Sequence, residues 1–341
     1  MPDARIVSAA SSPEEAQFEA GLRPRRLADF TGQTKLKENL AIAIAAARHR
    51  GDALDHVLLY GPPGLGKTTL AAIIAEELEV PFDQTSGPVL QKKLDLSGVL
   101  STIRPRQVFF IDEIHRLMPD IEEMLYSALE DFSLDILIGS GPGARTHSIP
   151  IQKFTAIGAT TRQGLVSAPL RGRFGLVLRL NHYDVPELET IVQRSAKLLN
   201  VTIDAEGAAE VARRSRGTPR IANRLLRRVR DFAQVRADGK ITRAIAETAL
   251  NLLEVDPFGL DEIDQKIMLT VLDKYRGGPV GVNTIGASIG EEAETIEEVY
   301  EPYLIQLGFL NRTPRGRVGT SLAFEYFKVN RRPEGSQPAL F

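Results

Sequence analysis

The sequence has no cysteine and only five histidines among its 341 residues. Without cysteine, the chain cannot form disulfide bonds, thiolate metal sites or a catalytic thiol. The histidines are scattered, and no two of them are spaced i, i+4, so we do not expect a zinc site. No apolar run approaches the ~18 residues of a membrane-spanning helix. These absences exclude a disulfide scaffold, a thiol enzyme and a protein with a membrane-spanning helix.

An excess of charge of one sign is also missing, because 42 Lys and Arg residues stand against 44 Asp and Glu residues. The net charge of −2 gives no overall positive field, so any nucleic-acid site must be a local patch. The N-terminal segment lacks the basic and apolar regions of a secretory signal. We therefore expect a cytoplasmic protein in which residues 1–20 and 331–341 are flexible tails.

Two kinds of pattern divide the rest of the chain. In residues 21–183, short apolar runs alternate with amphipathic stretches, which is typical of an α/β domain with a parallel sheet. Residues 184–255 show no strand signals and predict a small all-helical domain. Residues 256–330 predict three helices and then residues 309–327 as two short strands around the turn at 313–316, the order of a winged helix. The strands expected in the first domain are His56–Tyr60, Val108–Ile111, Phe154–Ile157 and Leu176–Leu180, and its clearest helical stripe is Ile121, Met124, Leu125, Ala128 and Leu129.

A glycine-rich segment follows the first expected strand. Residues 61–69, GPPGLGKTT, match the pattern G-x-x-x-x-G-K-[ST] between a strand and a helix. Glycines let successive backbone N–H groups surround a phosphate, and the helix start adds partial positive charge. Lys67 would contact the β- and γ-phosphates of ATP, and Thr68 would offer its hydroxyl to Mg²⁺. The alternative, a chance match in a glycine-rich turn, is disfavoured by this context. The predicted ATP-binding residues of the segment are Gly61, Gly64, Gly66, Lys67, Thr68 and Thr69.

Two carboxylates follow the second expected strand, at Asp112 and Glu113. A buried parallel strand that ends in acids places them at the same sheet edge as the phosphate loop. Asp112 would then hold the Mg²⁺ shell, and Glu113 would polarise the attacking water. The alternative is a strand that simply ends in a charged turn.

Five segments in this order resemble the AAA+ ATPases, namely GPPGLGKTT, FFIDEIHRL, GATTR, APLRGRFG and GTPRIANRLLRR. More narrowly, GTPRIANRLLRRVRDFA and EPYLIQLGFLNRTPRGR resemble the RuvB family, bacterial motors that migrate Holliday junctions. The resemblance extends from Leu22 to Phe327. It implies an AAA+ P-loop domain, a helical lid domain and a winged-helix DNA-binding domain, with ATP and Mg²⁺ as cofactors.

The resemblance also implies roles for residues outside the phosphate loop. Arg173 matches the arginine finger, which stabilises transition-state charge on a neighbouring subunit's nucleotide. The active sites would then lie between subunits, and the family forms a hexameric ring. Thr161 matches sensor 1, where many AAA+ proteins have asparagine, and Arg220 matches sensor 2. The positions that line the base and ribose of ATP match Leu22, Arg23 and Tyr183.

A β-hairpin is expected where Leu134–Ile138 and Arg145–Ile151 flank the loop Gly139–Gly143. Its apolar residues exceed what a free hairpin can bury. The resemblance implies that it docks the junction-binding protein RuvA, whereas the alternative is a hairpin packed on its own domain. The predicted partner-binding residues are Ile136, Ile138, Ile149 and Ile151.

The last domain carries its positive charge on the expected wing rather than on a helix. Its expected third helix, residues 291–307, is strongly acidic and would be repelled by a major groove. Flexible arginines beside glycine suit contacts with the phosphate backbone, which carry no sequence information. The predicted DNA-binding residues are Arg312, Arg315 and Arg317. The resemblance implies DNA contacts for the first and last of these, while Ala293 replaces a basic residue that is common in the family.

The leading hypothesis is an ATP-driven DNA motor. It would migrate Holliday junctions by pulling duplex DNA through a ring, together with RuvA and a larger complex containing the RuvC resolvase, in homologous recombination and DNA repair. One alternative is a clamp-loader or origin-type switch that uses ATP to bind DNA without moving it. Another is an ATPase that regulates transcription through an operator-reading winged helix, against which the acidic third helix argues.

Overall fold

The computed structural model describes residues 19–138 and 145–330, with backbone alone at 136–138 and 145–146. It consists of two compact units, one formed by residues 20–183 and the other by residues from 184 onward together with Glu19. The predicted tails, residues 1–20 and 331–341, lie almost entirely outside the described residues. No helix among the described residues is long and apolar enough to cross a bilayer.

A five-stranded parallel sheet forms the centre of the first unit, with the strand order β2-β3-β6-β1-β7. This confirms the predicted α/β fold and its four strands. The prediction missed β2 because the sequence there is polar, and β2 lies at the sheet edge, where it pairs only with β3. The strands are β1 (Val57–Tyr60), β2 (Phe82–Ser86), β3 (Val108–Asp112), β6 (Thr155–Thr160) and β7 (Leu176–Arg179).

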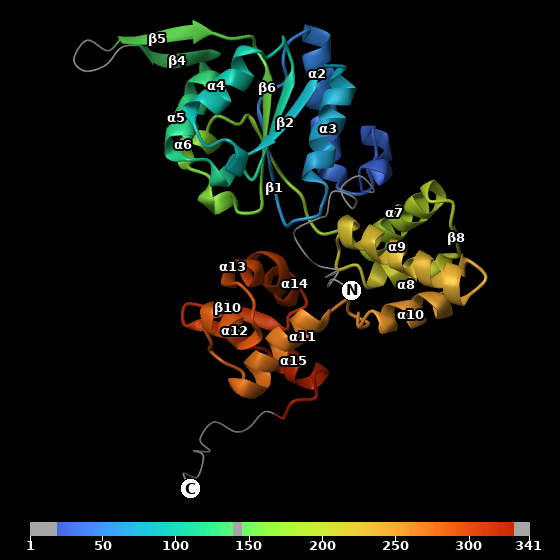
Figure 1. Ribbon diagram of the computed structural model, residues 1–341. Helices are drawn as coiled ribbons and strands as arrows, with labels where there is room; N and C mark the ends of the chain where they lie inside the picture. The colour runs from blue at the N-terminus through green and yellow to red at the C-terminus, as the bar shows by residue number, and fades with distance from the viewer. Residues whose placement is uncertain (1–18, 139–144, 331–341) are drawn as a thin grey trace. The chain divides into compact units, whose positions relative to one another are not determined.

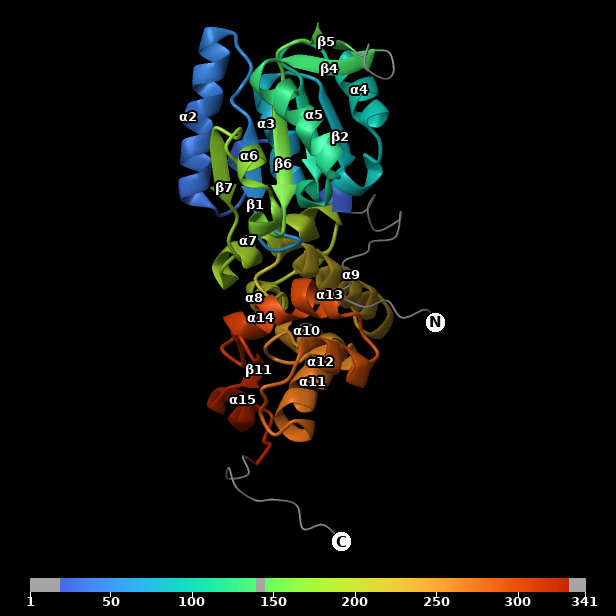
Figure 2. The same ribbon diagram turned by 90° about the vertical axis from the view of Figure 1, so that its left-hand side faces the viewer.

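Helices cover both faces of this sheet, with α2 and α3 on one side and α4, α5 and α6 on the other (Figures 1 and 2). All five residues of the predicted helical stripe are buried in α5, where they belong to one core cluster with Phe109 and Ile111 of β3. The helices are α2 (Thr34–Arg50), α3 (Lys67–Leu78), α4 (Lys93–Ser101), α5 (Pro119–Glu130) and α6 (Ala168–Arg171), and short 3₁₀ turns occupy Leu27–Asp29, Gly87–Val89, Ile114–Arg116 and Gln163–Leu165.

The expected hairpin is also confirmed. Strand β4 (Ser133–Ile138) pairs antiparallel with β5 (Arg145–Pro150), outside the main sheet (Figure 1). The loop between them, which includes Gly139–Gly143, lies outside the described residues.

The first half of the second unit is a helical lid, residues 184–255. Its first helix begins where the sequence predicts, because the Asp184 carboxylate accepts from the Glu187 N–H at 2.8 Å and Pro186 lies in the first turn. The expectation of no strands was wrong in one detail, since β8 and β9 form a short parallel pair. The lid elements are α7 (Val185–Leu198), β8 (Thr202–Ile203), α8 (Ala205–Arg213), α9 (Pro219–Arg236), β9 (Lys240–Ile241) and α10 (Arg243–Leu252).

The second half, residues 256–330, is a winged-helix head. The wing is the pair β10 and β11, which confirms the two expected strands, but the second strand ends at Gly319 and does not extend to Phe327. Thr320 caps a final helix instead, because its hydroxyl accepts from the Ala323 N–H at 3.2 Å. The third helical segment begins at Ala293 rather than at Glu291. The head elements are α11 (Glu262–Leu269) with a π-helical turn (Thr270–Lys274), α12 (Val282–Ile289), α13 (Ala293–Thr295) with a π-helical turn (Ile296–Tyr300), α14 (Glu301–Gln306), β10 (Leu310–Thr313), β11 (Gly316–Gly319) and α15 (Ser321–Tyr326).

A buried histidine lies just before β1. The imidazole of His56 is 7% exposed, and both of its nitrogens contact backbone groups. The Ala156 N–H donates to Nδ1 at 2.9 Å, so Nε2 carries the proton and donates to the Leu129 carbonyl at 2.9 Å. Burial lowers the pKa of His56 below its usual range, because the charged imidazolium is poorly solvated there.

We expect this histidine to make the fold sensitive to acid. The unfolded chain takes up a proton at His56 near pH 6.5, whereas the folded chain resists it, so stability is lost as pH falls below about 6.5. The melting temperature of the natural chain and of His56→Gln, measured from pH 8 to pH 5, checks this. The natural chain should lose more stability toward acid than the variant, and parallel curves would contradict the assignment.

Candidate functional site

The phosphate loop connects β1 to α3 at the carboxyl edge of the sheet. Its three glycines all have positive φ, at 146°, 77° and 99° for Gly61, Gly64 and Gly66. A Cβ at Gly61 would lie 2.4 Å from the Leu180 carbonyl oxygen, so only glycine fits there. The loop backbone therefore has the conformation that the motif requires.

Lys67 is the first residue of α3, and its side chain is folded over the loop. Its ammonium donates to the carbonyl of Gly61 at 2.8 Å and to that of Pro62 at 2.9 Å. The residue is 8% exposed. The charge of Lys67 is thus held within the loop, beside the backbone that would surround a phosphate.

The two acids at the end of β3 lie beside the loop. The Thr68 hydroxyl is 3.5 Å from a carboxylate oxygen of Asp112, which brings together the two residues predicted to hold Mg²⁺. Hydroxyl and carboxylate oxygens are the donors that Mg²⁺ prefers, so this pair fits the ion. Glu113 has a left-handed backbone with φ 47°, and its carboxylate is 3.2 Å from the Arg116 guanidinium.

Strand β6 lies between β3 and β1, and its end completes this edge. The Gly61 N–H donates to the Thr160 carbonyl at 3.2 Å, which ties the phosphate loop to β6. The Thr160 hydroxyl is buried and lies 3.0 Å from Nδ1 of His115. Thr161, the predicted sensor, follows directly and is half-buried. The structure therefore gathers the phosphate loop, the two acids and Thr161 at one edge.

The residues expected near the base and ribose lie in two segments of the same unit. Tyr183 is buried, and its hydroxyl donates to the Leu65 carbonyl of the phosphate loop at 3.2 Å. Leu22 is buried, whereas Arg23 is exposed. Phe30, which follows them, packs against the loop beside Gly66.

Arg173 lies at the opposite end of β1 from the phosphate loop. It lines a pocket with Asp55 and His56, which directly precede β1. The four residues of β1 separate this pocket from Gly61, a span of roughly 13 Å in a β-strand. Arg173 is held there by the Glu130 carboxylate at 2.8 Å, by the Pro169 carbonyl at 2.8 Å and by the Tyr126 ring 4.5 Å away. It is not assembled with the other predicted catalytic residues of its own chain.

Comparisons with known proteins identify the family. Three models match in order, namely the Holliday junction DNA helicase RuvB P-loop domain over residues 22–180, the RuvB AAA lid domain over 183–256 and the RuvB C-terminal winged helix domain over 257–328. The Holliday junction branch migration complex subunit RuvB of Solibacter usitatus is 76% identical, covering 100% of this chain and 99% of that protein. The chain belongs to the RuvB family.

Other relatives agree with this assignment. The RuvB subunit of Koribacter versatilis is 63% identical and covers 99% of this chain and 93% of that protein. The solved structure of the Thermotoga maritima RuvB Holliday junction branch migration motor is 51% identical, with a TM-score of 0.82 over 90% of this chain and 98% of that chain. The AAA+ fold expected from the sequence is thus confirmed.

The predicted sensor 2 arginine of this RuvB-family chain lies in the second unit. Arg220 is the second residue of α9, and its guanidinium is 3.4 Å from the Glu19 carboxylate. The phosphate loop belongs to the first unit.

The wing places its three arginines in different environments. Arg315 is exposed at the turn between β10 and β11, and no carboxylate of the described residues pairs with it. Arg312 is 61% exposed and lies 3.3 Å from Glu297. Arg317 differs, because its side chain is 9% exposed and donates to Glu301 at 2.8 Å and to Glu297 at 2.6 Å. The expectation of a flexible arginine is wrong for Arg317, since the acidic third helix holds it inside the head.

The apolar residues of the hairpin also differ in their exposure to solvent. Ile149 is 45% exposed, whereas Ile151 is half-buried against the core cluster that contains Leu134. The side chains of Ile136 and Ile138 lie outside the described residues. The hairpin thus has an exposed apolar residue on β5 and, directly after that strand, another residue that packs on its own domain.

Several residues beside the site escaped the sequence analysis. Arg116 contacts Glu113, His115 contacts Thr160, and Tyr126 and Glu130 hold Arg173. The first two lie in the segment FFIDEIHRL, so their closeness to Asp112 and Glu113 in sequence was a usable signal. Nothing in the sequence marks Tyr126 and Glu130, because their partner Arg173 lies more than 40 residues away.

The buried state of Arg317 predicts opposite outcomes for two neighbouring arginines. Arg317→Ala leaves the Glu301 carboxylate buried without its partner, and should destabilise the chain by about 3–5 kcal/mol. Arg315→Ala removes an exposed side chain and should change stability by less than about 0.5 kcal/mol. Urea unfolding of both variants measures the difference, and equal stabilities would contradict the buried pair.

Proposed function

We propose that this chain is an ATP-driven motor that migrates Holliday junctions by moving duplex DNA, in homologous recombination and DNA repair. Two observations support the proposal. Relatives that share up to 76% of their residues with this chain over its full length are named Holliday junction branch migration complex subunit RuvB. The phosphate loop and the acids of β3 also have the geometry of a hydrolytic nucleotide site.

For the nucleotide, we propose the roles that the sequence suggests. The loop glycines and Lys67 bind the β- and γ-phosphates, with Thr69 beside them, and Thr68 and Asp112 would hold Mg²⁺. Bound Mg²⁺ would neutralise negative charge on the phosphates. Glu113 orients and polarises the attacking water, Thr161 contacts the γ-phosphate, and Arg220 responds to the nucleotide from the lid. The remaining predicted contacts, with the base and ribose, are made by Leu22, Arg23 and Tyr183.

The position of Arg173 supports an active site shared between subunits. A guanidinium that is a strand's length from its own phosphate loop can stabilise only a phosphate held by another chain. We therefore propose that Arg173 acts on a neighbour's ATP. A heterologous contact of this kind, repeated around an axis, closes into a ring, and we propose the hexamer of the family.

For DNA and partners, we propose that the three arginines of the wing have different roles. Arg315, with Arg312 beside it, contacts phosphates without reading sequence, whereas Arg317 holds the wing against the third helix rather than touching DNA freely. The hairpin, which carries Ile136, Ile138, Ile149 and Ile151, docks RuvA, and among its described side chains Ile149 is exposed for this contact, whereas Ile151 packs partly on its own domain. The RuvC resolvase joins the larger complex. The functional domains would be residues 21–183, 184–255 and 256–330, and the protein would act in the cytoplasm.

Dissociation of a synthetic four-way junction tests the motor. With ATP and Mg²⁺ the natural chain should separate the junction, faster when RuvA is added, whereas Glu113→Gln should bind ATP and DNA without moving the junction. ATP-dependent binding without movement, equal for both proteins, would favour a loader or switch and reject the motor.

Mixed rings test the position of Arg173. Lys67→Ala and Arg173→Ala should each abolish ATP hydrolysis alone, yet an equimolar mixture should recover part of it. In a random ring, about a quarter of the interfaces then pair an intact phosphate loop with an intact Arg173. A mixture of Lys67→Ala with the chain carrying both changes provides the control and should stay inactive. No recovery in the first mixture would show that Arg173 does not act between subunits.

A further inference from the structure

A buried ion pair joins the lid to the head. Arg216 lies in the lid, between α8 and α9, and Asp264 lies in α11 of the head. Two nitrogens of the guanidinium donate to the two carboxylate oxygens, at 2.9 and 3.0 Å. The side chains are 2% and 0% exposed. This paired geometry fixes the orientation of the two groups as well as their distance.

The surroundings of this lid arginine come from the head. The guanidinium lies over the Tyr303 ring at 4.6 Å and near the Tyr300 ring at 5.9 Å. Asp264 also accepts from the Asp261 N–H at 3.0 Å, which caps the start of α11. Asp264 thus serves both the start of the first helix of the head and the ion pair with the lid.

The buried charges of Arg216 and Asp264 each depend on the other for stability. Burial raises the pKa of the Asp264 carboxyl, and the charge of Arg216 and the hydrogen bond from the Asp261 N–H oppose that rise. A charge left alone in such a place is strongly destabilising. The buried acid of the head therefore depends on an arginine supplied by the lid.

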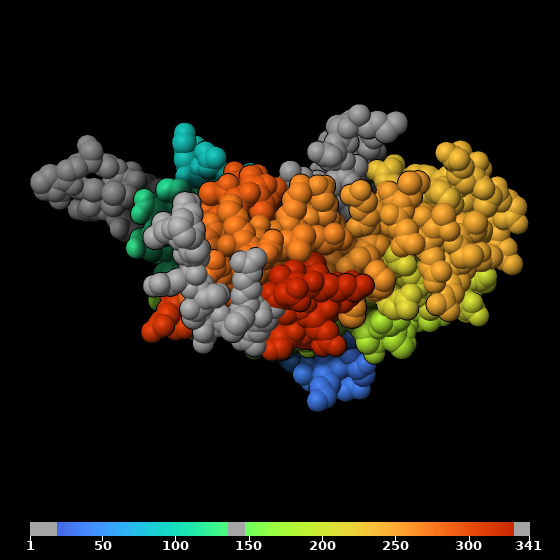
Figure 3. All heavy atoms as spheres, turned by 90° about the horizontal axis from the view of Figure 1, so that it is seen from below, coloured from blue at the N-terminus to red at the C-terminus, as the bar shows by residue number. Residues whose placement is uncertain are grey.

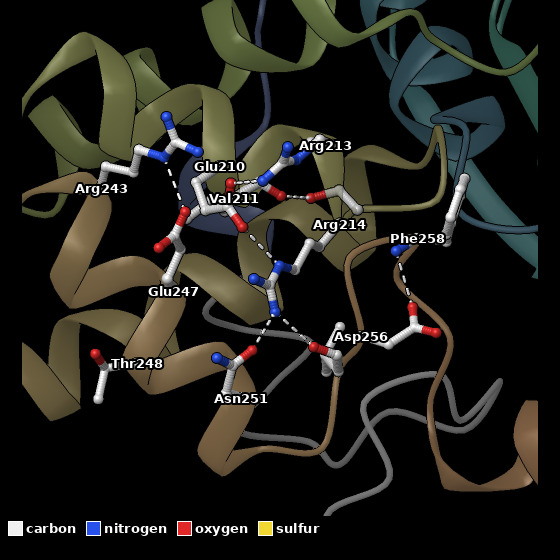
Figure 4. A network of polar contacts seen from close by, with 12 residues as sticks. Glu210, Val211, Arg213, Arg214, Arg243, Glu247, Thr248, Asn251, Asp256 and Phe258 are labelled. Carbon is white, nitrogen blue, oxygen red and sulfur yellow. Dashed lines mark hydrogen bonds and ion pairs between the residues drawn. The ribbon is translucent and has the colours of Figure 1, made fainter. Parts of the chain in front are cut away.

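The linker between the last helix of the lid and the first helix of the head, residues 255–261, is held as well (Figure 4). Arg214 of the lid donates at 2.7 Å to Asn251 and at 2.7 Å to the Val255 carbonyl, where the linker begins. Asp256 accepts from the Phe258 N–H at 2.9 Å. It also accepts from the Tyr326 hydroxyl of the head at 2.6 Å. Figure 3 shows the yellow and orange surface of the lid adjoining the orange and red surface of the head.

Arg216, the arginine of the buried ion pair, lies directly before the segment that carries Arg220. Arg216 and Gly217 both have left-handed backbones, with φ 56° and 67°. The Thr218 hydroxyl donates to the Arg216 carbonyl at 3.1 Å, and α9 begins at Pro219. The chain thus turns sharply into α9 while the Arg216 side chain remains inserted in the head.

We propose that Arg216 is a positioning residue that joins the lid and the head into one rigid arm. A shift of the Arg220 segment in response to the nucleotide then moves the wing by the same rotation. The inference builds on the proposed motor function, since it explains how a change at ATP reaches DNA. Without the ion pair, the lid could move while the head stayed behind.

A distance measurement tests the rigid arm without reference to motor activity. Because the natural chain has no cysteine, Val235→Cys in the lid and Leu322→Cys in the head, which are 79% and 51% exposed, can carry a fluorescent pair. The distribution of their distances should be narrow, and should broaden when Asp264→Asn removes the charge. Val229→Ala, which removes part of a buried side chain of α9 and leaves both charges of the ion pair in place, should keep the narrow distribution at lower stability.

A second variant keeps this test decisive. Arg216→Lys retains the charge but loses the paired hydrogen bonds, so it should also broaden the distribution even where Asp264→Asn folds poorly. If the folded variants have distance distributions as narrow as that of the natural chain, the proposal is overturned.

The number of base pairs migrated per ATP hydrolysed provides the functional readout. In Asp264→Asn, the number of base pairs migrated per ATP hydrolysed should fall about three- to tenfold, while ATP hydrolysis stays near the natural rate. A ratio equal to that of the natural chain would overturn the role of Arg216. If the natural chain hydrolyses ATP without moving a junction, the motor function fails, and the distance distributions alone then decide whether the arm is rigid.

Discussion

Strand β1 determines the geometry on which the nucleotide site depends. It is buried, and it hydrogen-bonds to β6 on one side and β7 on the other. The phosphate loop begins at its carboxyl end, and the pocket that holds Arg173 lies at its amino end. Since a strand cannot shorten, these two groups stay a strand's length apart in one chain. This separation is the physical reason for proposing an active site completed by a neighbour.

Two buried ion pairs organise the second unit in a similar way. Arg317 with Glu301 holds the wing against the third helical segment, and Arg216 with Asp264 holds the lid against the head. A desolvated charge requires a partner in a defined direction, so each pair specifies orientation as well as contact. Exposed arginines such as Arg315 face no such requirement and remain available for a ligand. Arginine thus serves two purposes in this unit: buried arginines hold structural elements together, and exposed arginines can bind a ligand.

Much of the fold could be predicted because its signals are local. The helical stripe of α5 is visible as apolar spacing, and the start of α7 as Asp184 followed by Pro186 and Glu187. The phosphate loop needs glycine at Gly61, where any other residue would collide with Leu180. Prediction failed at β2 because the strand is polar and forms only where β3 offers it an edge. The two strands of the wing were predicted correctly but too long, because Thr320 caps α15 directly after β11.

The sequence by itself determined the chemistry and the family, because motif residues must have particular side chains at particular spacings along the chain. It also determined the order of the domains and the residues that could bind a phosphate. Only the tertiary structure decided which arginines are buried, that Arg317 is held by Glu301, that Arg173 lies away from its own phosphate loop, and that Arg216 is inserted in the head. The reason is that burial and pairing depend on segments far apart in the chain, and an arginine looks the same in the sequence whether it faces water or a buried carboxylate.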